Sequence, residues 1–206
     1  MTTNTALLIT LAKPVPDEAE TFHGYVEAST HLALDAGGVV SSRVGVDHVH
    51  GDAPAVVFGL ATFPDVDAIT EMFAAQPYQD LIPARERSIE SVNAYAVADT
   101  PIAELPDHDG VLLVTVAAPN PEAMDDLAAY QQVAGPVSAR HGAQPVAQLP
   151  VAAHPVGSTP AAFVAIAAFP SRDAVDAFFA DPDYLEAIPL RDRALSSLNL
   201  YVSAAT

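Results

Sequence analysis

The chain has 206 residues, half of them apolar, and carries 26 acidic against 8 basic residues for a formal net charge of −18. Such a surface repels nucleic acid and anionic lipid, so we expect neither partner. No apolar run reaches the roughly 18 residues of a membrane span, and the N-terminus does not read as a secretory signal. The absence of cysteine excludes disulfides and thiolate chemistry. We therefore expect a soluble, cytoplasmic protein.

Each half of the chain begins with the pattern of a buried strand followed by a helix. Short apolar runs predict strands over 6–12 and 111–117. Proline and acidic residues near 16–18 and 120–122 are typical of helix starts. The glycines that follow, Gly37 and Gly142, are natural helix stops. The first helix runs to about residue 36, and one of its faces carries a mainly apolar stripe: Phe22, Tyr25, Val26, Ser29, Leu32, Ala33 and Ala36.

The rest of each half predicts two strands, a helix and a final strand. In the first half the strands lie at about 39–46 and 55–63. Asp65 and Ser171 are expected N-caps of second helices that reach about residues 75 and 180. A proline-bearing turn then leads into the last strand, over 91–97 or 197–203.

The two halves are similar to each other in sequence. When 54–98 is laid on 160–204, 18 of the 45 positions are identical, and upstream a shift of 105 matches Tyr25 to Tyr130. We therefore predict two tandem βαββαβ repeats, over 1–100 and 111–206, joined by a linker over 101–110. Each unit is a ferredoxin-like antiparallel sheet with both helices on one face. Covering the other face with the second copy gives an α+β fold, a dimeric α/β-barrel formed as a pseudo-dimer within one chain.

The second helix and the turn after it carry a motif that resembles an uncharacterised family of the dimeric α/β-barrel superfamily. In the second half the motif comprises Phe169-Pro170-Ser171, Ala174, Phe178-Phe179, Tyr184 and Arg191. The first half has Phe63-Pro64, Ala68, Phe73, Tyr78 and Arg85, but it departs from the motif at Asp65 and Met72, and the family's Trp is absent from both halves. The resemblance implies the barrel fold and leaves the activity open, because fold does not fix function. Wider relatives include polyketide cyclases, cofactor-free oxygenases, lactone isomerases and haem enzymes.

The last strand and the third strand point to a pocket. Ser-Asn-Tyr side chains alternate with apolar ones, and period 2 sends the polar set, which includes Asn93, Tyr95, Asn199 and Tyr201, to the barrel interior. Small residues such as Gly59 alternate with bulkier ones on the third strand and leave room for a ligand. The Asn and Tyr donors could orient a carbonyl or a phenol. The alternative is a fully hydrogen-bonded polar seam between two sheets.

Arginines offer a second set of candidate ligand-binding residues. Arg85, Arg87, Arg191 and Arg193 are four of the eight basic residues and recur at matching positions, so they could anchor a carboxylate or an enolate. The alternative is ion pairs with neighbours such as Glu86 and Asp192. Because Arg43 matches Gln148 and Ser41 matches Val146, we expect unequal cavities and place the working site in the more polar first half. The candidate ligand-binding residues are Tyr25, Arg43, Arg85, Asn93, Tyr95, Tyr130, Arg191, Asn199 and Tyr201.

The histidines do not form a metal-site pattern. His23, Glu27 and His31 have helical spacing, but they lie opposite the apolar stripe and are expected to be solvated. His48 and His50 could share one strand face, and His48 matches His154, although the residues around them are typical of a loop. No cluster of three or four zinc ligands is visible, so we expect no metal, no haem and no other cofactor.

Two functions from different classes remain. One is a cofactor-independent cyclase, isomerase or oxygenase that acts on a small apolar carbonyl or phenolic compound. The other is a non-catalytic barrel that binds a small molecule or serves a structural role. In both, the expected partner is a small-molecule ligand, with a further homodimer left open.

Overall fold

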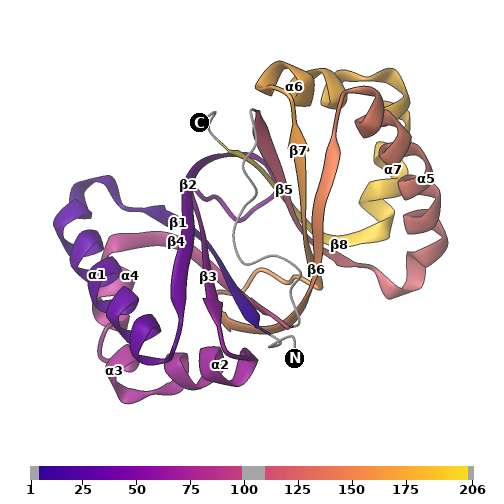
Figure 1. The fold of residues 1–206 in the computed structure, drawn as a ribbon. Helices are drawn as coiled ribbons and strands as arrows, with labels where there is room; N and C mark the ends of the chain where they lie inside the picture. Colours follow the sequence, from indigo (N-terminus) through magenta and orange to yellow (C-terminus); the bar gives the residue numbers. More distant parts are fainter. Residues whose placement is uncertain (1–4, 99–109, 204–206) are drawn as a thin grey trace. The chain divides into compact units, whose positions relative to one another are not determined.

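The computed structural model describes residues 5–98 and 110–203. In the first half, the elements are β1 (Ala6–Pro14), α1 (Ala19–Asp35), β2 (Val39–His50), β3 (Val57–Phe63), α2 (Val66–Ala74), α3 (Gln76–Gln79), α4 (Ile82–Ser88) and β4 (Ile89–Val97) (Figure 1). In the second half, they are β5 (Val111–Pro119), α5 (Met124–Arg140), β6 (Gln144–Val156), β7 (Phe163–Phe169), α6 (Arg172–Ala180), α7 (Pro182–Ala194) and β8 (Leu195–Ser203). One turn of 3-10 helix precedes α1 and another precedes α5. Most of the predicted linker, 101–109, lies outside the described residues.

The predicted strands and the first two helices of each half are confirmed, with their caps. The Asp65 carboxylate accepts from the Ala68 amide at 2.7 Å, and the Ser171 hydroxyl accepts from the Ala174 amide at 3.2 Å. These bonds satisfy amides that have no partner within the first helical turn. The sequence prediction was wrong about the segment before the last strand, which is helical in both halves and not a turn. In α4 the proline lies in the first turn, where no backbone N–H is required.

Two compact units divide the chain, and each includes a segment from the other half. Unit 1 comprises 1–46, 53–105 and 149–159, whereas unit 2 comprises 47–52, 106–148 and 160–206. Strands follow the order β2-β3-β1-β4-β6 in unit 1 and β6-β7-β5-β8-β2 in unit 2. The exchanged segments, 47–52 and 149–159, are called the arms below. The loop predicted around His48 and His154 was wrong, because β2 continues to His50 and β6 continues to Val156, and the alternative that His48 and His50 lie on one strand is the one observed.

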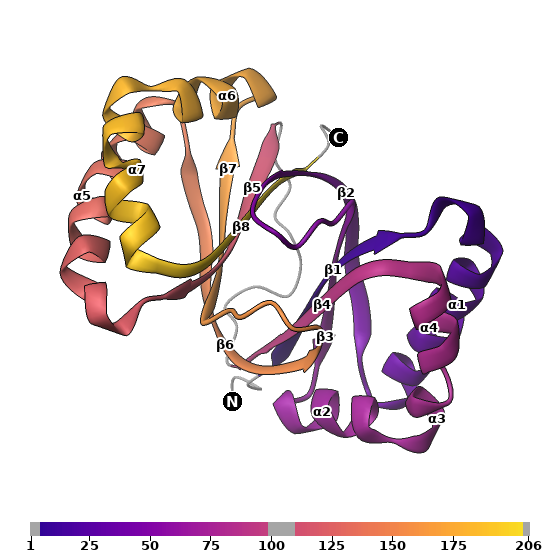
Figure 2. The same ribbon diagram turned by 180° about the vertical axis from the view of Figure 1, so that it is seen from behind.

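Helices cover one face of the sheet in each unit (Figures 1 and 2). In unit 1 the apolar residues of β4, among them Ala94 and Ala96, pack into one core with Ile69, Phe73 and Tyr78 of the helical segments. Val202 and Leu200 of β8 pack in the same way in unit 2. The predicted orientation of the last strands is therefore confirmed, and their Asn and Tyr side chains lie on the opposite face. No helix in the described ranges is long and apolar enough to cross a membrane.

Candidate functional site

The Asn and Tyr side chains of β4 hold an arm of the chain. The Asn93 Oδ1 atom accepts from the Thr159 amide, and the Tyr95 hydroxyl donates to the Thr159 carbonyl, both at 3.1 Å. The His154 ring stacks on Tyr95 at 4.6 Å between centroids. Both Asn93 and Tyr95 are buried, and we call this pair, which binds the arm that contains Thr159, the socket of unit 1. Neither residue lines the cavity described below.

A matching socket lies in unit 2. Tyr201 and Asn199 on β8 are buried, and the His48 ring lies 5.3 Å from the Tyr201 ring. Gly51, in the arm over 47–52, approaches the Asn199 side chain so closely that a Cβ atom would collide with it. The recurrence of the same contact types indicates that the sequence similarity of the last strands preserves arm binding.

A cavity of about 130 Å³ lies between α1 and the sheet of unit 1. Cross-strand pairing builds its floor, because Gly59 on the central strand β3 pairs with Arg43 on one side and with Thr10 on the other. Directly paired residues point to the same face of a sheet. A Cβ atom at Gly59 would come within 2.6 Å of the Thr10 Oγ1 atom, so glycine keeps this floor open. The small residues of β3 therefore do border a cavity, but on the helix-covered face and not in the interior to which the sequence assigned it.

Two tyrosines and an arginine form a hydrogen-bonded chain at this cavity. Tyr25 on α1 and Tyr78 on α3 both line it, and their hydroxyl oxygens lie 3.0 Å apart. The Arg85 Nη1 atom donates to the Tyr78 hydroxyl at 3.3 Å. Burial raises the pKa of Tyr25 above its ordinary value, so the phenol stays protonated in the physiological range.

The hydroxyl protons of the two tyrosines leave this hydrogen-bonded chain with one donor that has no acceptor within it. Arginine can only donate, so it supplies the Tyr78 oxygen with a proton and takes none. The two phenols have two protons, and their mutual hydrogen bond uses one of them. When Tyr78 donates to Tyr25, the proton of Tyr25 is left for a group in the cavity. The Arg85 charge favours this direction because it polarises the Tyr78 hydroxyl towards donation.

Arg43 is the cation at the cavity wall. Its side chain lines the cavity, and the residue is exposed on β2. It makes no hydrogen bond or ion pair with any residue that the structure describes. The structure thus brings together three of the sequence-predicted residues, Tyr25, Arg43 and Arg85, and it separates Asn93 and Tyr95 from them.

A second cavity, of about 250 Å³, occupies the matching place in unit 2. The Arg191 Nη1 atom donates to the Tyr184 hydroxyl at 3.2 Å, and Tyr184 is hydrogen-bonded to Tyr130. Arg191 also contacts the Asp192 carboxylate at 2.7 Å, which is the ion pair that the sequence offered as the alternative. Gln148 stands where the first cavity has Arg43. The two cavities are unequal in volume and lining, as the sequence suggested.

No histidine in the part of the chain that the structure describes lines either cavity. His23, Glu27 and His31 are exposed, as expected. Among the described residues, no three His, Asp or Glu side chains form a group that could hold a metal ion.

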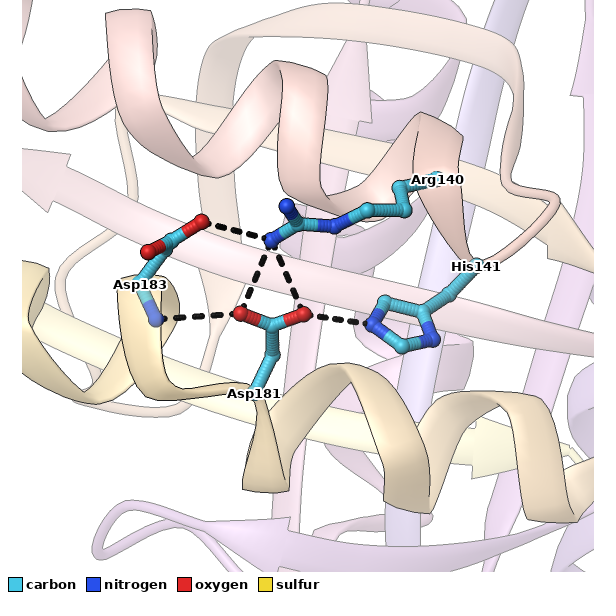
Figure 3. Close-up of polar contacts among 4 residues, drawn as sticks. All are labelled: Arg140, His141, Asp181 and Asp183. Atoms are coloured by element: carbon cyan, nitrogen blue, oxygen red, sulfur yellow. Dashed lines mark hydrogen bonds and ion pairs between the residues drawn. The ribbon is translucent and has the colours of Figure 1, made fainter.

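A charged cluster fastens α5 to α7 at the surface of unit 2 (Figure 3). The Asp181 carboxylate, at the N-cap of α7, accepts from Arg140 at 2.9 Å and contacts the His141 ring at 2.8 Å. Arg140 also pairs with Asp183 at 2.8 Å. The pKa of Asp181 is held below its usual range, first by the hydrogen bond to His141. Because the cluster ties two helix ends together, we regard it as structural.

Sequence reasoning missed Tyr78 and Tyr184 as site residues. The two tyrosines belong to the motif described above and match each other across the halves. Each recurs together with an arginine, Arg85 or Arg191, and this recurrence was the signal that could have indicated a site. Their role depends on a helix that the sequence had read as a turn.

The second half of the chain is similar to one protein family. Residues 111–204 match a family described as Domain of unknown function (DUF1330). None of the curated proteins matches the chain.

Two solved structures resemble the chain over nearly all of its length. An anthrone oxidase-like protein matches at a TM-score of 0.61 and 14% identity, over 98% of this chain and 92% of that chain. A mutant chlorite dismutase from Candidatus Nitrospira defluvii matches at a TM-score of 0.54 and 8% identity, over 98% of this chain and 91% of that chain. These likenesses show the fold alone, which is the α+β fold of the dimeric α/β barrels, as the sequence predicted.

Proposed function

We propose that the cavity of unit 1 binds a small, largely apolar carbonyl or phenolic compound through the Tyr25 hydroxyl. The chain from Arg85 through Tyr78 to Tyr25 is the observation that carries this proposal. An apolar cavity near 150 Å³ can hold one benzene ring, so about 130 Å³ with an open side suits a single ring with one polar substituent. The ligand oxygen accepts the phenolic proton that the tyrosine pair leaves over.

The same geometry supports a cofactor-independent reaction. A neutral donor aligned before the reaction stabilises negative charge that develops on a ligand oxygen, and such donors contribute about 10²–10³ in rate where they have been removed. Enolisation, cyclisation and cofactor-free oxygenation all pass through an enolate or phenolate oxygen. One solved structure with the same fold is named an anthrone oxidase-like protein.

The alternative is a carrier that binds without reaction. The described residues of the first cavity include no carboxylate and no imidazole that would act as a general base. That observation favours the carrier until turnover is measured.

Calorimetric titration with phenol and toluene tests the binding proposal. We expect phenol to bind the intact protein more tightly than toluene, and Tyr25→Phe to weaken phenol binding about 3- to 10-fold, the range of one neutral hydrogen bond. Tyr130→Phe is the matched control and should leave the first cavity unaffected. Equal phenol affinity in the intact protein and in Tyr25→Phe would refute the role of Tyr25.

Proton exchange separates the enzyme from the carrier. The α-protons of cyclohexanone in D₂O can be followed by NMR with and without the protein. Exchange faster than in buffer, and slowed by Tyr25→Phe, supports enolate chemistry. Binding with exchange at the buffer rate supports the carrier.

We also propose that the chain is a tandem duplication with repeats over 1–100 and 111–206. The identities between the halves and the repeated element order support it. Recovery of both halves by a single sequence profile built from either half would test it.

A further inference from the structure

Arg43 differs from every other Lys or Arg side chain of this protein. The remaining seven all have partners: Lys13 pairs with Glu90, Arg85 with Tyr78 and Glu86, Arg87 with Glu18, Arg140 with Asp181 and Asp183, Arg172 with Asp47 and Asp176, Arg191 with Tyr184 and Asp192, and Arg193 with Asp126. The Arg43 side chain alone makes no hydrogen bond or ion pair within the described residues. In a chain with a net charge of −18, acidic partners are abundant, so an arginine without one stands out.

The position of Arg43 directs it to the cavity. It pairs across the sheet with Gly59, so no side chain lies between it and the cavity floor. Gly59 pairs on its other side with Thr10, which continues the same row. Arg43 thus lies at the edge of the cavity floor, and its cross-strand neighbour there has no side chain.

The lining of the cavity suits a negative charge at that edge. None of the described lining residues is acidic, although the chain has 26 acidic residues. An anionic group would therefore meet one cation and no like charge inside the cavity. Arginine presents a planar fork of donors that matches a carboxylate, a geometry that lysine and glutamine lack.

We propose that the ligand of the first cavity is an organic carboxylate, a single-ring hydroxy- or oxo-acid whose acid group pairs with Arg43 and whose oxygen at the far end accepts from Tyr25. This inference rests on the proposed function and names its substrate class. The second cavity has Gln148 at the matching position and no described cation in its lining, so it selects an uncharged ligand.

Binding of 4-hydroxybenzoate and 4-hydroxybenzamide to the full chain tests the proposal by calorimetry. The two probes have the same ring and phenol and differ only in charge. We expect the acid to bind about 10-fold more tightly than the amide at low ionic strength, and the difference to shrink in 0.5 M salt because an exposed charge pair is screened. Arg43→Gln, which installs the residue of the second half, should abolish the preference for the acid.

Arg87→Gln is the matched control. It removes one positive charge from the chain, but Arg87 pairs with Glu18 and does not line the cavity. This variant should keep the full preference for the acid, whereas an equal loss in both variants would show only a long-range charge effect and overturn the proposal. Equal binding of acid and amide to the intact protein would refute the carboxylate and leave the proposed function standing. Failure of both probes to bind, with or without Arg43, would count against the proposed function itself.

Discussion

Replacing Gly157 with alanine should loosen the arm that Asn93 holds. Gly157 has a φ of 98°, a region that side-chain-bearing residues avoid. A Cβ atom there would collide with the side-chain oxygen Oδ1 of Asn93 and with the backbone carbonyl oxygen of Val92. The backbone strain costs about 1–2 kcal/mol. Loss of the buried bond between Asn93 and Thr159 adds about 1–3 kcal/mol.

The two contributions sum to about 3.5 kcal/mol as a central value. For a chain of this size each kcal/mol lowers the melting temperature by about 2–4 °C, so Gly157→Ala should lower it by about 7–14 °C. Differential scanning calorimetry measures this. Gly51→Ala in the other arm, with a φ of 104° and the same collision with Asn199, should behave alike.

Gly24→Ala provides the contrast. Gly24 lies within α1, and nothing is within 4 Å of the position that its Cβ would take. Alanine is favoured over glycine in a helix by about 0.5–1 kcal/mol, so this variant should melt slightly higher than the unchanged protein. If Gly157→Ala also melts higher, or is unchanged, the arm is not held at Asn93 in the way that we describe.

Three further predictions concern pH, packing and the charged cluster. Burial lowers the pKa of His154 from its usual 6.5, so below pH 6.5 the unfolded chain binds a proton that the folded protein does not, and acid lowers the stability of the fold. His154→Gln removes this group and should therefore reduce the loss of melting temperature between pH 7 and 5. Ala61→Leu should fill the first cavity and remove the part of the phenol binding measured by calorimetry that Tyr25→Phe weakens, whereas the matching Ala167→Leu should leave that part unchanged. Asp181→Asn should lower the melting temperature above pH 4, and the difference should vanish as the pH falls through the lowered pKa of Asp181, because the carboxylate then becomes neutral in both proteins.

The strands and caps could be read from the sequence because local chemistry determines them. Alternation on the last strands and the oxygens of Asp65 and Ser171 act within a few residues of the chain. The alternation also correctly assigned the two faces of the sheet. It could not say which face carries a cavity, because that depends on how closely α1 approaches the small residues of β3.

The roles of Asn93 and Tyr95 depend on segments that are distant in sequence. Their partners, Thr159 and His154, are more than fifty residues away and belong to the other half of the chain. Polar residues on a strand face predict that something polar meets them, but a ligand and an arm give the same pattern. The sequence left open a ligand pocket and a polar region that is hydrogen-bonded within the protein, and the second describes these contacts.

The central claim, that the first cavity binds a ligand through Tyr25, is tested most directly by the electron density in that cavity in crystals of the protein as purified. A crystal structure at a resolution that separates ring atoms should show a single-ring compound in the cavity between α1 and the sheet of unit 1, with an oxygen within hydrogen-bonding distance of the Tyr25 hydroxyl. Soaking with phenol gives the same test if the compound is lost during purification. Density for a ring that leaves Tyr25 without contact, or a cavity that stays closed by side chains after soaking, would contradict the account.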